Sequence, residues 1–307
     1  MKTASPGNGI LLLDKPLGLS SNAALQKTRR MLGADKAGHV GSLDPLASGM
    51  LPICLGEATK IAGDILSGRK LYRFTVALGT RTATGDTEGG VVETAAVPDF
   101  DESQLDRVLL QFHGNQTQIP PMYSALKKDG QPLYKLARAG IEVERAARSI
   151  EIFALTRQAW SARQLWSADH LELEVLCSKG TYVRTLAEDI AKSLGTCGHV
   201  HALRRVYVEP FNEAPMDTLE SIARALEAGG LPTILPADAP LQHMVAIRLD
   251  SRATEKMLHG QPVTAGDCGT VGRVRLYDAD GAFIGIGESD GAGSVRPKRL
   301  FSFNDGQ

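Results

Sequence analysis

Residues 36–52 read KAGHVGSLDPLASGMLP, and the rest of the chain is best understood outward from this stretch. Four turn-forming residues surround one histidine and one aspartate in it: Gly38, Gly41, Pro45 and Gly49. Glycine and proline at this density break a helix and are poorly tolerated in a buried strand. We therefore predict a shaped loop. Because loops held by a rigid scaffold often carry functional residues, Asp44 becomes a candidate catalytic residue.

The length and composition indicate a globular protein with two domains. The chain has 307 residues, which suits one larger domain and a small one. Its hydrophobic content of 43% and charged content of 22% are ordinary for a folded protein. The net charge is −1, although residues 1–75 hold ten Lys or Arg against five Asp or Glu. Such a segment can form a phosphate-binding surface, but an ordinary solvated surface explains the count equally well.

The cysteines and the absence of targeting segments favour a cytoplasmic protein. Four cysteines are scattered at positions 54, 177, 197 and 268 without a CxxC pair, which is typical of reduced thiols in the cytosol. Neither a signal peptide nor a membrane span is visible, so we expect no membrane association. Cys197, His199 and His201 would share one face of a strand, but zinc usually takes four ligands, and we expect no metal site.

Hydrophobic periodicity defines the predicted elements. Strands are predicted at residues 9–13, 69–79, 91–94, 149–157 and 170–177, and helices at residues 22–32, 59–66, 101–112, 182–194 and 219–227. The strand at 69–79 places Tyr72 on its apolar face. Residues 79–90 are rich in glycine and hydroxyl groups and are predicted as a loop.

Changes in sequence texture suggest how the chain is divided. Residues 1–8 are small and polar and are predicted as a mobile tail. Residues 127–148 are basic, and we expect an insertion over about residues 120–150 that closes on a ligand. A cluster of glycine and proline at residues 229–240 is the best linker. Beyond it, residues 245–307 read as a small, mostly β domain with a hairpin at Asp280-Gly281.

The motifs exclude several classes of enzyme and favour another. The chain has no G-x-S-x-G, no P-loop and no G-x-G-x-x-G after its first strand, which argues against an α/β-hydrolase and against a nucleotide cofactor. Asp44 alone would be an ordinary Asp-Pro turn. Three further segments supply an arginine, two tyrosines and basic residues: residues 69–74 (RKLYRF), 179–186 (KGTYVRTL) and 203–205 (LRR). Together they suit a base drawn out of a nucleic acid, stacked on an aromatic ring and attacked.

At this point a family resemblance becomes clear. Residues 38–49 closely resemble the signature of the TruB class of pseudouridine synthases, and further motifs resemble that class in the same order over at least residues 9–211. These motifs are residues 14–22, Tyr72, and residues 78–86, 120–125, 179–184 and 203–205. Residues 259–301 resemble a PUA-type RNA-binding domain. The resemblance implies an α+β fold with a mixed, mainly antiparallel central sheet flanked by helices and loops. It also implies a catalytic domain at residues 9–244 and a β-rich PUA-like domain at residues 245–307.

The resemblance also implies a reaction and a set of site residues. The family isomerises uridine-55 in the TΨC loop of tRNA to pseudouridine by base flipping, moving the glycosidic bond from N1 to C5 without cofactor or metal. Asp44 matches the catalytic aspartate, acting as nucleophile or as proton-abstracting base, and Arg184 matches the arginine that pairs with it. The remaining matches are Tyr72, which stacks on the uracil and assists at C5, His39, which enters the RNA loop, and Tyr182 and Leu203, which line the pocket. Lys15, with Lys127, Lys128 and Arg138, is expected to contact phosphates.

The resemblance implies an RNA partner, and two alternative functions stand beside the proposed reaction. The expected partner is the T-arm and elbow of tRNA, bound by a monomer that needs no obligate protein partner. One alternative is an RNA-folding module that acts without chemistry. Another is a relative that modifies other RNAs through guide complexes, but a compact chain without long charged tails favours a stand-alone enzyme.

Overall fold

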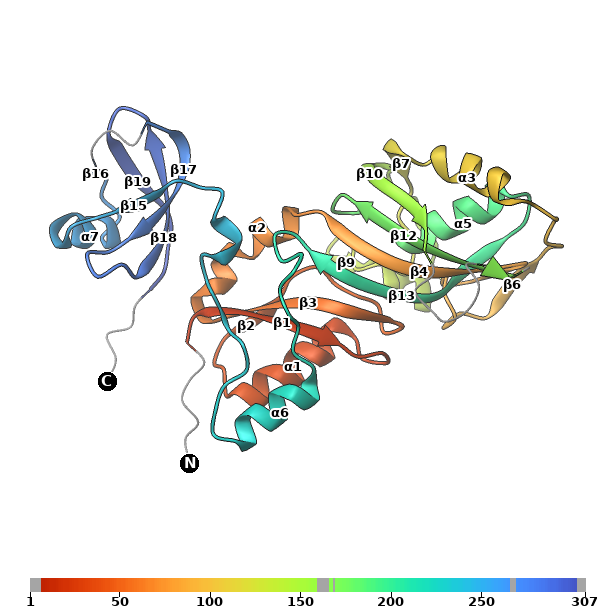
Figure 1. Ribbon diagram of the computed structural model, residues 1–307, viewed down its shortest axis with the longest axis horizontal. Helices are drawn as coiled ribbons and strands as arrows, with labels where there is room; N and C mark the ends of the chain where they lie inside the picture. The colour runs from red at the N-terminus through yellow and green to blue at the C-terminus, as the bar shows by residue number, and fades with distance from the viewer. Residues whose placement is uncertain (1–6, 159–165, 168, 266–268, 303–307) are drawn as a thin grey trace.

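The computed structural model describes residues 7–158, 166–167, 169–265 and 269–302 (Figure 1). Of the tail predicted for residues 1–8, only Gly7 and Asn8 are among them, and Asn8 Oδ1 accepts a hydrogen bond from the Glu57 amide at 2.8 Å. Cys268 also lies outside the described residues. No helix in the described part of the chain is long and apolar enough to cross a membrane.

The larger sheet is mainly antiparallel, as predicted. Its strands follow the order β14-β1-β3-β13-β4-β12-β10-β7, with β2 paired to β3 and β11 paired to β12. The pairing of β3 with β13 is parallel, and the other pairings in this sheet are antiparallel. The bounds are β1 Gly9–Lys15, β2 Ala37–His39, β3 Ala47–Leu55, β4 Lys70–Leu78, β7 Gly114–Gln118, β10 Arg148–Arg157, β11 Trp166–Ser167, β12 His170–Cys177, β13 Gly198–Val208 and β14 Leu235–Pro236. The strand β13 therefore joins the two halves of the sheet.

Helices cover each half of this sheet (Figure 1). α1 (Ser21–Leu32) and α6 (Leu219–Glu227) lie together beside β1 and β3, whereas α3 (Glu102–Leu110) and α5 (Val183–Ser193) cover the half that contains β4, β12 and β10. Each helix begins where its sequence predicts. Ser20 caps α1 by accepting from the Ala23 amide, and Gly33 ends it in the left-handed conformation. The buried faces of these helices share one apolar core with the sheet.

The stretch 36–52 is less irregular than its glycines predict. Ala37–His39 forms β2, and β3 begins at Ala47, so the loop itself spans only residues 40–46. The prediction of a loop over the whole stretch is wrong, because Gly49 lies within β3, where it permits a close approach of two strands instead of forming a turn. Gly49 has φ +100, and a Cβ there would lie 2.1 Å from the carbonyl oxygen of Arg205. Glycine thus lets β13 approach β3 closely enough for the parallel pairing.

The second half of the sheet follows the predicted elements, with additions in its loops. β10 and β12 correspond to the strands predicted at 149–157 and 170–177 and pair with each other, and α5 buries Val183, Leu186 and Ile190. The predicted loop at 79–90 contains a short strand, β5 (Thr80–Thr82), which pairs with β6 (Val91–Thr94). Residues 120–150 contain a small hairpin and a short helix: β8 (Lys127–Lys128), β9 (Gln131–Pro132) and α4 (Leu133–Arg138).

The C-terminal residues form a separate β-rich unit. Its sheet has the order β15-β17-β18-β19-β16, with bounds Ala246–Arg248, Val271–Tyr277, Phe283–Asp290, Ser294–Leu300 and Val263–Thr264 in that order. The hairpin predicted at Asp280-Gly281 joins β17 and β18. The helix α7 (Ser251–Leu258), capped by Asp250, was not predicted. This unit packs against η1 (Gly56–Ile61) and α2 (Ala62–Ser67), and the remaining short helix is η2 (Ala239–Leu241).

Candidate active site

A cavity of about 430 Å³ lies where the two halves of the larger sheet meet. Its lining comes from the loop at 41–44, α2, β4, β13, the segment 124–126, and the first turn of α5 with the turn that leads into it. It brings together predicted site residues that are far apart in the sequence: Asp44, Tyr72, Tyr182, Arg184 and Leu203. His39 and Lys15 are not among the residues that line it.

Asp44 is placed by hydrogen bonds that fix the loop on both sides of it. The buried hydroxyl of Ser21 donates to the Leu43 carbonyl at 2.9 Å and accepts from the Leu43 amide at 2.7 Å. On the other side, the Gly18 amide donates to the Pro45 carbonyl at 2.8 Å. The segment at 14–22 therefore holds the loop in shape, which explains why both segments belong to one family signature.

The carboxylate of Asp44 forms an ion pair with Arg184, with 3.0 Å between Oδ2 and Nη2. Arg184 lies in the first turn of α5, and its side chain is only 6% exposed, compared with 38% for Asp44. The guanidinium also donates to the carbonyls of Thr84 and Tyr123, at 2.8 and 2.7 Å. These contacts fix the cation, so it can hold the Asp44 carboxylate in one orientation.

Asp86 is a second carboxylate on the same arginine, and sequence reasoning gave it no role. It is 1% exposed, and its Oδ2 lies 3.4 Å from Arg184 Nη1. The Thr84 hydroxyl donates to Asp86 Oδ1 at 2.5 Å, and the Glu88 amide donates to the same oxygen at 3.0 Å. Asp86 lies within the motif at 78–86, which was the available signal, but its partner was not apparent from a loop sequence.

Burial and neighbouring charges oppose each other at Asp44. Desolvation raises the pKa of Asp44 above its ordinary value, Arg184 counteracts the rise, and Asp86 adds to it. The net shift of the pKa is upward. Arg184 therefore lowers the pKa of Asp44, but the effect of burial on this pKa is larger.

The aromatic and apolar walls come from three elements. Tyr72 on β4 is 9% exposed, and Leu203 on the neighbouring β13 is 7% exposed. Tyr182 immediately precedes α5, where its amide donates to Gln118 Oε1 at 2.8 Å and its carbonyl accepts from Gln118 Nε2 at 3.0 Å. Burial raises the pKa of both tyrosines, so their hydroxyls are neutral near pH 7 in the absence of substrate.

Arg205 is a further cation in the lining. It was part of the motif at 203–205, but sequence reasoning gave a role only to Leu203. Its side chain is the largest of those that are almost completely buried, with 1% exposure. Lys70 also lines the cavity; its ammonium donates to the Leu66 and Gly68 carbonyls, and burial lowers its pKa to about 8.

Two predicted RNA contacts lie elsewhere. Lys15 was expected to contact a phosphate, but it is 0% exposed, and its ammonium donates to the carbonyls of Pro16 and Leu19 at 2.9 and 2.6 Å. This corrects the prediction: Lys15 stabilises the turn that supports the Asp44 loop, and burial lowers its pKa to about 8. His39 lies on β2 and is half-buried, and burial together with Arg205 lowers its pKa, which favours the neutral ring.

The histidines and cysteine considered as metal ligands do not meet. An irregularity in β13 between Val200 and Ala202 interrupts the alternation on which a shared face depends. His199 Nδ1 lies 2.8 Å from the Thr80 carbonyl oxygen, whereas the ring of His201 stacks edge-on against His170. Within the described residues, no group of three or more His, Cys, Asp or Glu could hold a metal ion.

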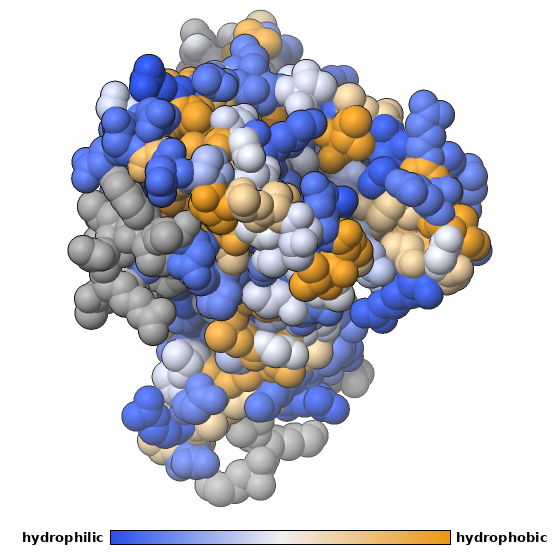
Figure 2. All heavy atoms as spheres, turned by 90° about the vertical axis from the view of Figure 1, so that its right-hand side faces the viewer, coloured by the Kyte–Doolittle hydropathy of each residue, from blue (hydrophilic) through white to orange (hydrophobic). Residues whose placement is uncertain are grey.

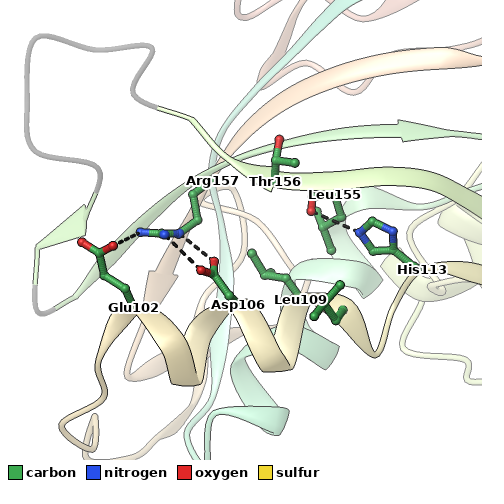
Figure 3. A pocket seen from close by; sticks show the side chains of 8 residues that line it. Glu102, Asp106, Leu109, His113, Leu155, Thr156 and Arg157 are labelled. Atoms are coloured by element: carbon green, nitrogen blue, oxygen red, sulfur yellow. Dashed lines mark hydrogen bonds and ion pairs between the residues drawn. The ribbon is translucent and has the colours of Figure 1, made fainter.

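A second hollow, of about 500 Å³, lies between α3 and β10, away from these residues (Figure 3). Arg157 on β10 reaches across it to Glu102 and Asp106 on α3, and His113 Nε2 lies 3.3 Å from the Leu155 carbonyl. Its charged groups pair with one another, so they fasten α3 to the sheet. Figure 2 shows the end of the molecule that carries α3 and β6, where apolar residues occur in small groups separated by polar ones.

Comparisons with known proteins agree on one family. Residues 29–183 match the model of the TruB family pseudouridylate synthase N-terminal domain, residues 184–242 a tRNA pseudouridylate synthase B C-terminal domain, and residues 246–301 the C-terminal domain of pseudouridine synthase II TruB. The tRNA pseudouridine synthase B of Stutzerimonas stutzeri is 49% identical over 297 residues, covering 95% of each chain. That of Dechloromonas aromatica is 47% identical over 298 residues, covering 97% of each chain.

Solved structures share the fold at lower identity. The crystal structure of a Cbf5-Nop10-Gar1 complex matches with a TM-score of 0.71 and 22% identity, covering 97% of this chain and 86% of that chain. A structure of an H/ACA RNP bound to a substrate RNA containing 2′-deoxyuridine matches with a TM-score of 0.69 and 20% identity, covering 97% and 86%. The chain belongs to the TruB family of pseudouridine synthases. It is thus an enzyme that converts uridine to pseudouridine.

Proposed function

We propose that this protein isomerises uridine-55 in the TΨC loop of tRNA to pseudouridine. The observation that carries the proposal is the Asp44–Arg184 ion pair in the wall of a cavity that also presents Tyr72, Tyr182 and Leu203. A cavity of about 430 Å³ has room for one flipped nucleotide, and its mixture of aromatic, apolar and charged walls suits a pyrimidine. The relatives named above as tRNA pseudouridine synthase B support tRNA as the substrate.

The proposed reaction is an exchange of one bond for another. The N1–C1′ bond of the nucleotide breaks, a C5–C1′ bond forms, C5 loses its proton and N1 gains one. Asp44 acts in its ionised form, either as a nucleophile that adds to the base or sugar or as a base that removes a proton from the ribose. Arg184 keeps the carboxylate aimed at the substrate, because its own position is fixed by two carbonyls and Asp86.

The walls of the cavity have complementary roles in this proposal. Tyr72 stacks on the flipped uracil and assists removal of the proton at C5, while Tyr182 and Leu203 enclose the base and exclude water. His39 enters the RNA loop as the base leaves it, where an inserted ring can partly offset the cost of unstacking that base.

We also propose that residues outside the cavity bind the RNA. Lys127 and Lys128 are exposed on the β8–β9 hairpin, and with Arg138 on α4 they give the segment at about 120–150 a basic surface for phosphates. In this division residues 9–244 form the catalytic domain, and residues 245–307 form a PUA-like RNA-binding domain. The enzyme acts in the cytoplasm, where tRNA is found, as a monomer without an obligate protein partner. Light scattering of the purified protein tests the last point.

The decisive experiment follows tritium. The wild-type protein is expected to release tritium from tRNA that carries [5-³H]uridine, and pseudouridine mapping is expected to find the product at position 55. Asp44→Asn should abolish release while tRNA binding survives, because the amide keeps the shape but cannot act as nucleophile or base. Asp35→Asn, which changes an exposed carboxylate, is the matched control and should leave release unchanged.

Turnover by Asp44→Asn at the wild-type rate would rule out the proposed catalytic role of this residue. Refolding of tRNA by Asp44→Asn without modification would add an RNA-folding activity to the enzyme. A wild-type protein that binds and refolds tRNA but never releases tritium would replace the proposed function with that activity.

A further inference from the structure

Arg205 is a buried cation without a counter-ion. It lies on β13 at the centre of the sheet, is 1% exposed and lines the cavity. Among the described residues, no carboxylate lies within ion-pair distance of its guanidinium. Burying a charge is unfavourable unless something compensates it, and buried arginines normally face a carboxylate. Because Arg205 has no such carboxylate in the described part of the chain, we look for a neighbouring group that carries negative charge during the reaction.

The contacts of Arg205 connect the parts of the site to one another. Its Nε donates to the Met50 carbonyl on β3 at 2.7 Å, and its Nη2 donates to the Gly41 carbonyl at 2.9 Å. Gly41 begins the short segment that ends at Asp44, and a Cβ at Gly41 would lie 3.2 Å from Arg205 Nη1. The guanidinium is therefore pressed against the backbone of the Asp44 loop, and glycine at position 41, with φ +70, makes this approach possible.

The same guanidinium faces Tyr72. Arg205 and Tyr72 are register partners on the neighbouring strands β13 and β4, and both line the cavity. Arg205 lowers the pKa of Tyr72 against the rise that burial causes. The other titratable groups that act on Tyr72 are Cys177, whose own pKa burial raises to about 11, and Asp44; both raise the pKa of Tyr72. Arg205 is thus the cation that stabilises negative charge at the Tyr72 oxygen.

We propose that Arg205 is a positioning residue for the isomerisation, which holds the Asp44 loop and the Tyr72 oxygen in one arrangement and favours negative charge at that oxygen. The proposal rests on the function proposed above, since it assigns Tyr72 a part in the chemistry. It differs from the role of Arg184, which pairs directly with Asp44. One residue on β13 thereby sets the relative positions of the acid and the aromatic ring.

Three variants test the proposal in single-turnover tritium release. Arg205→Met keeps length but removes charge and donors, and we expect a fall of about 100-fold in rate with tRNA affinity within about threefold of wild type. Arg205→Lys keeps the charge but loses the planar set of N–H donors of the guanidinium, and we expect the rate to fall about tenfold. Arg107→Met is the matched control, because Arg107 is exposed on α3 and is not among the residues that line the cavity. It should leave the rate unchanged.

Two further readouts separate positioning from mere support of the fold. Loss of the cation raises the pKa of Tyr72, so the increase of the release rate with pH should be shifted to higher pH in Arg205→Met than in wild type. Arg205→Lys should keep the pH profile of the wild type. In a Tyr72→Phe background, Arg205→Met should lower the release rate by less than about threefold, because most of its effect depends on the Tyr72 hydroxyl, which this background lacks. Equal losses in both backgrounds, with unchanged pH profiles, would overturn the proposal.

Separate controls test whether the variants fold and whether the proposed function holds. Thermal unfolding checks each variant, and if Arg205→Met does not fold, Arg205→Lys decides the matter: a wild-type rate for it contradicts positioning by the guanidinium. A wild-type protein without any tritium release refutes the proposed function itself. Wild-type release together with full activity of Arg205→Met refutes only the role of Arg205.

Discussion

The carboxylate of Asp44 combines solvent access with an environment that disfavours its charge. Its side chain is 38% exposed, yet burial and the neighbouring Asp86 raise its pKa, and the ion pair with Arg184 only partly compensates. A carboxylate that is less stable when ionised is also more reactive as a base or nucleophile, provided it remains ionised at the working pH. The site therefore holds Asp44 at a cost in folding stability.

This cost predicts a dependence of stability on pH. The folded-state pKa of Asp44 lies above its unfolded value, so the folded state binds the proton more tightly, and stability is lost as pH rises through the folded pKa. We expect Asp44→Asn to unfold at a higher temperature than wild type near neutral pH, with the difference shrinking as the pH falls toward about 4. Calorimetry across this range is the measurement. Asp35→Asn, at an exposed position, should show no such trend, and a neutral-pH destabilisation of Asp44→Asn would contradict the prediction.

At this scale the sequence predicted several residues that gather at one site, but not those whose placement depends on tertiary packing. Asp44, Tyr72 and Arg184 meet in the cavity as the motifs implied. The role of Arg205 depends on which strands flank β13, and no local pattern reveals that register. Lys15 was misplaced because a lysine is usually exposed, whereas here the turn that follows supplies carbonyls for a buried ammonium.

Among the elements, β3 and β13 show how a single glycine controls the pairing of strands. Gly49 pairs with Arg205 in parallel register, and its Cβ position is occupied by the Arg205 carbonyl. We expect Gly49→Ala to lower the free energy of unfolding by about 3 kcal/mol, from a strained φ and a backbone clash. Urea unfolding measures it. Gly63→Ala is the control, since Gly63 lies in α2 with open space around it, and alanine there should stabilise by up to about 1 kcal/mol. Equal midpoints for the two variants would contradict the role assigned to Gly49.

The β8–β9 hairpin carries a prediction about binding. Replacing Lys127 and Lys128 by glutamine should weaken tRNA binding and reduce the slope of log Kd against log salt by about two, because each lysine is expected to neutralise one phosphate. The measurement is filter binding at several salt concentrations. Lys192→Gln is the control, because Lys192 is exposed in the last turn of α5, at the far end of that helix from Arg184. A slope that stays at the wild-type value would show that the hairpin does not contact phosphates.

The longer helices and several strands followed from periodicity, but the central strand β13 was not predicted. Some of the other exceptions have physical causes. β2 and β5 are short strands in glycine-rich stretches, and their pairing with β3 and β6 outweighs the weak propensity of their residues. The helix α7 was missed because only Met257 is fully buried along it, so the apolar stripe that reveals a helix is faint. Its signal was Asp250, a capping residue whose side chain accepts from the Ala253 amide.

The whole molecule is held together by an apolar cluster that crosses between the two sheets. Ile286 and Phe301 of the C-terminal unit share this cluster with Ile61 and Ile65 of η1 and α2. Polar contacts surround it: Arg273 forms a bidentate ion pair with Asp64, and Lys60 donates to the Leu300 carbonyl at 2.8 Å. The C-terminal unit is therefore docked in a defined position, which the RNA-binding role proposed for it requires if this unit is to align a substrate with the cavity.

This docking gives a prediction for substrates of different length. Phe301 is 3% exposed and packs edge-on against Phe283, so Phe301→Ala should weaken the docking by about 3 to 5 kcal/mol. We expect a higher KM for full tRNA, an unchanged KM for an isolated T-arm hairpin, and faster proteolysis at residues 229–240. Val271→Ala is the control, because Val271 is 80% exposed. An equal rise in KM for both substrates would instead indicate damage to the catalytic domain.

The position of β13 has a consequence for synthesis of the chain. β13 occupies the gap between β3 and β4, so β4 lacks a partner on one edge, and β3 lacks one at residues 47–49, until residue 208 has left the ribosome. Until then the Asp44 loop also lacks the strand that carries Leu203 and Arg205. An incomplete nascent chain can expose the aspartate to RNA, but it cannot enclose a base. Catalytic competence therefore arises only after translation has passed the central strand, and products that end before it are inactive.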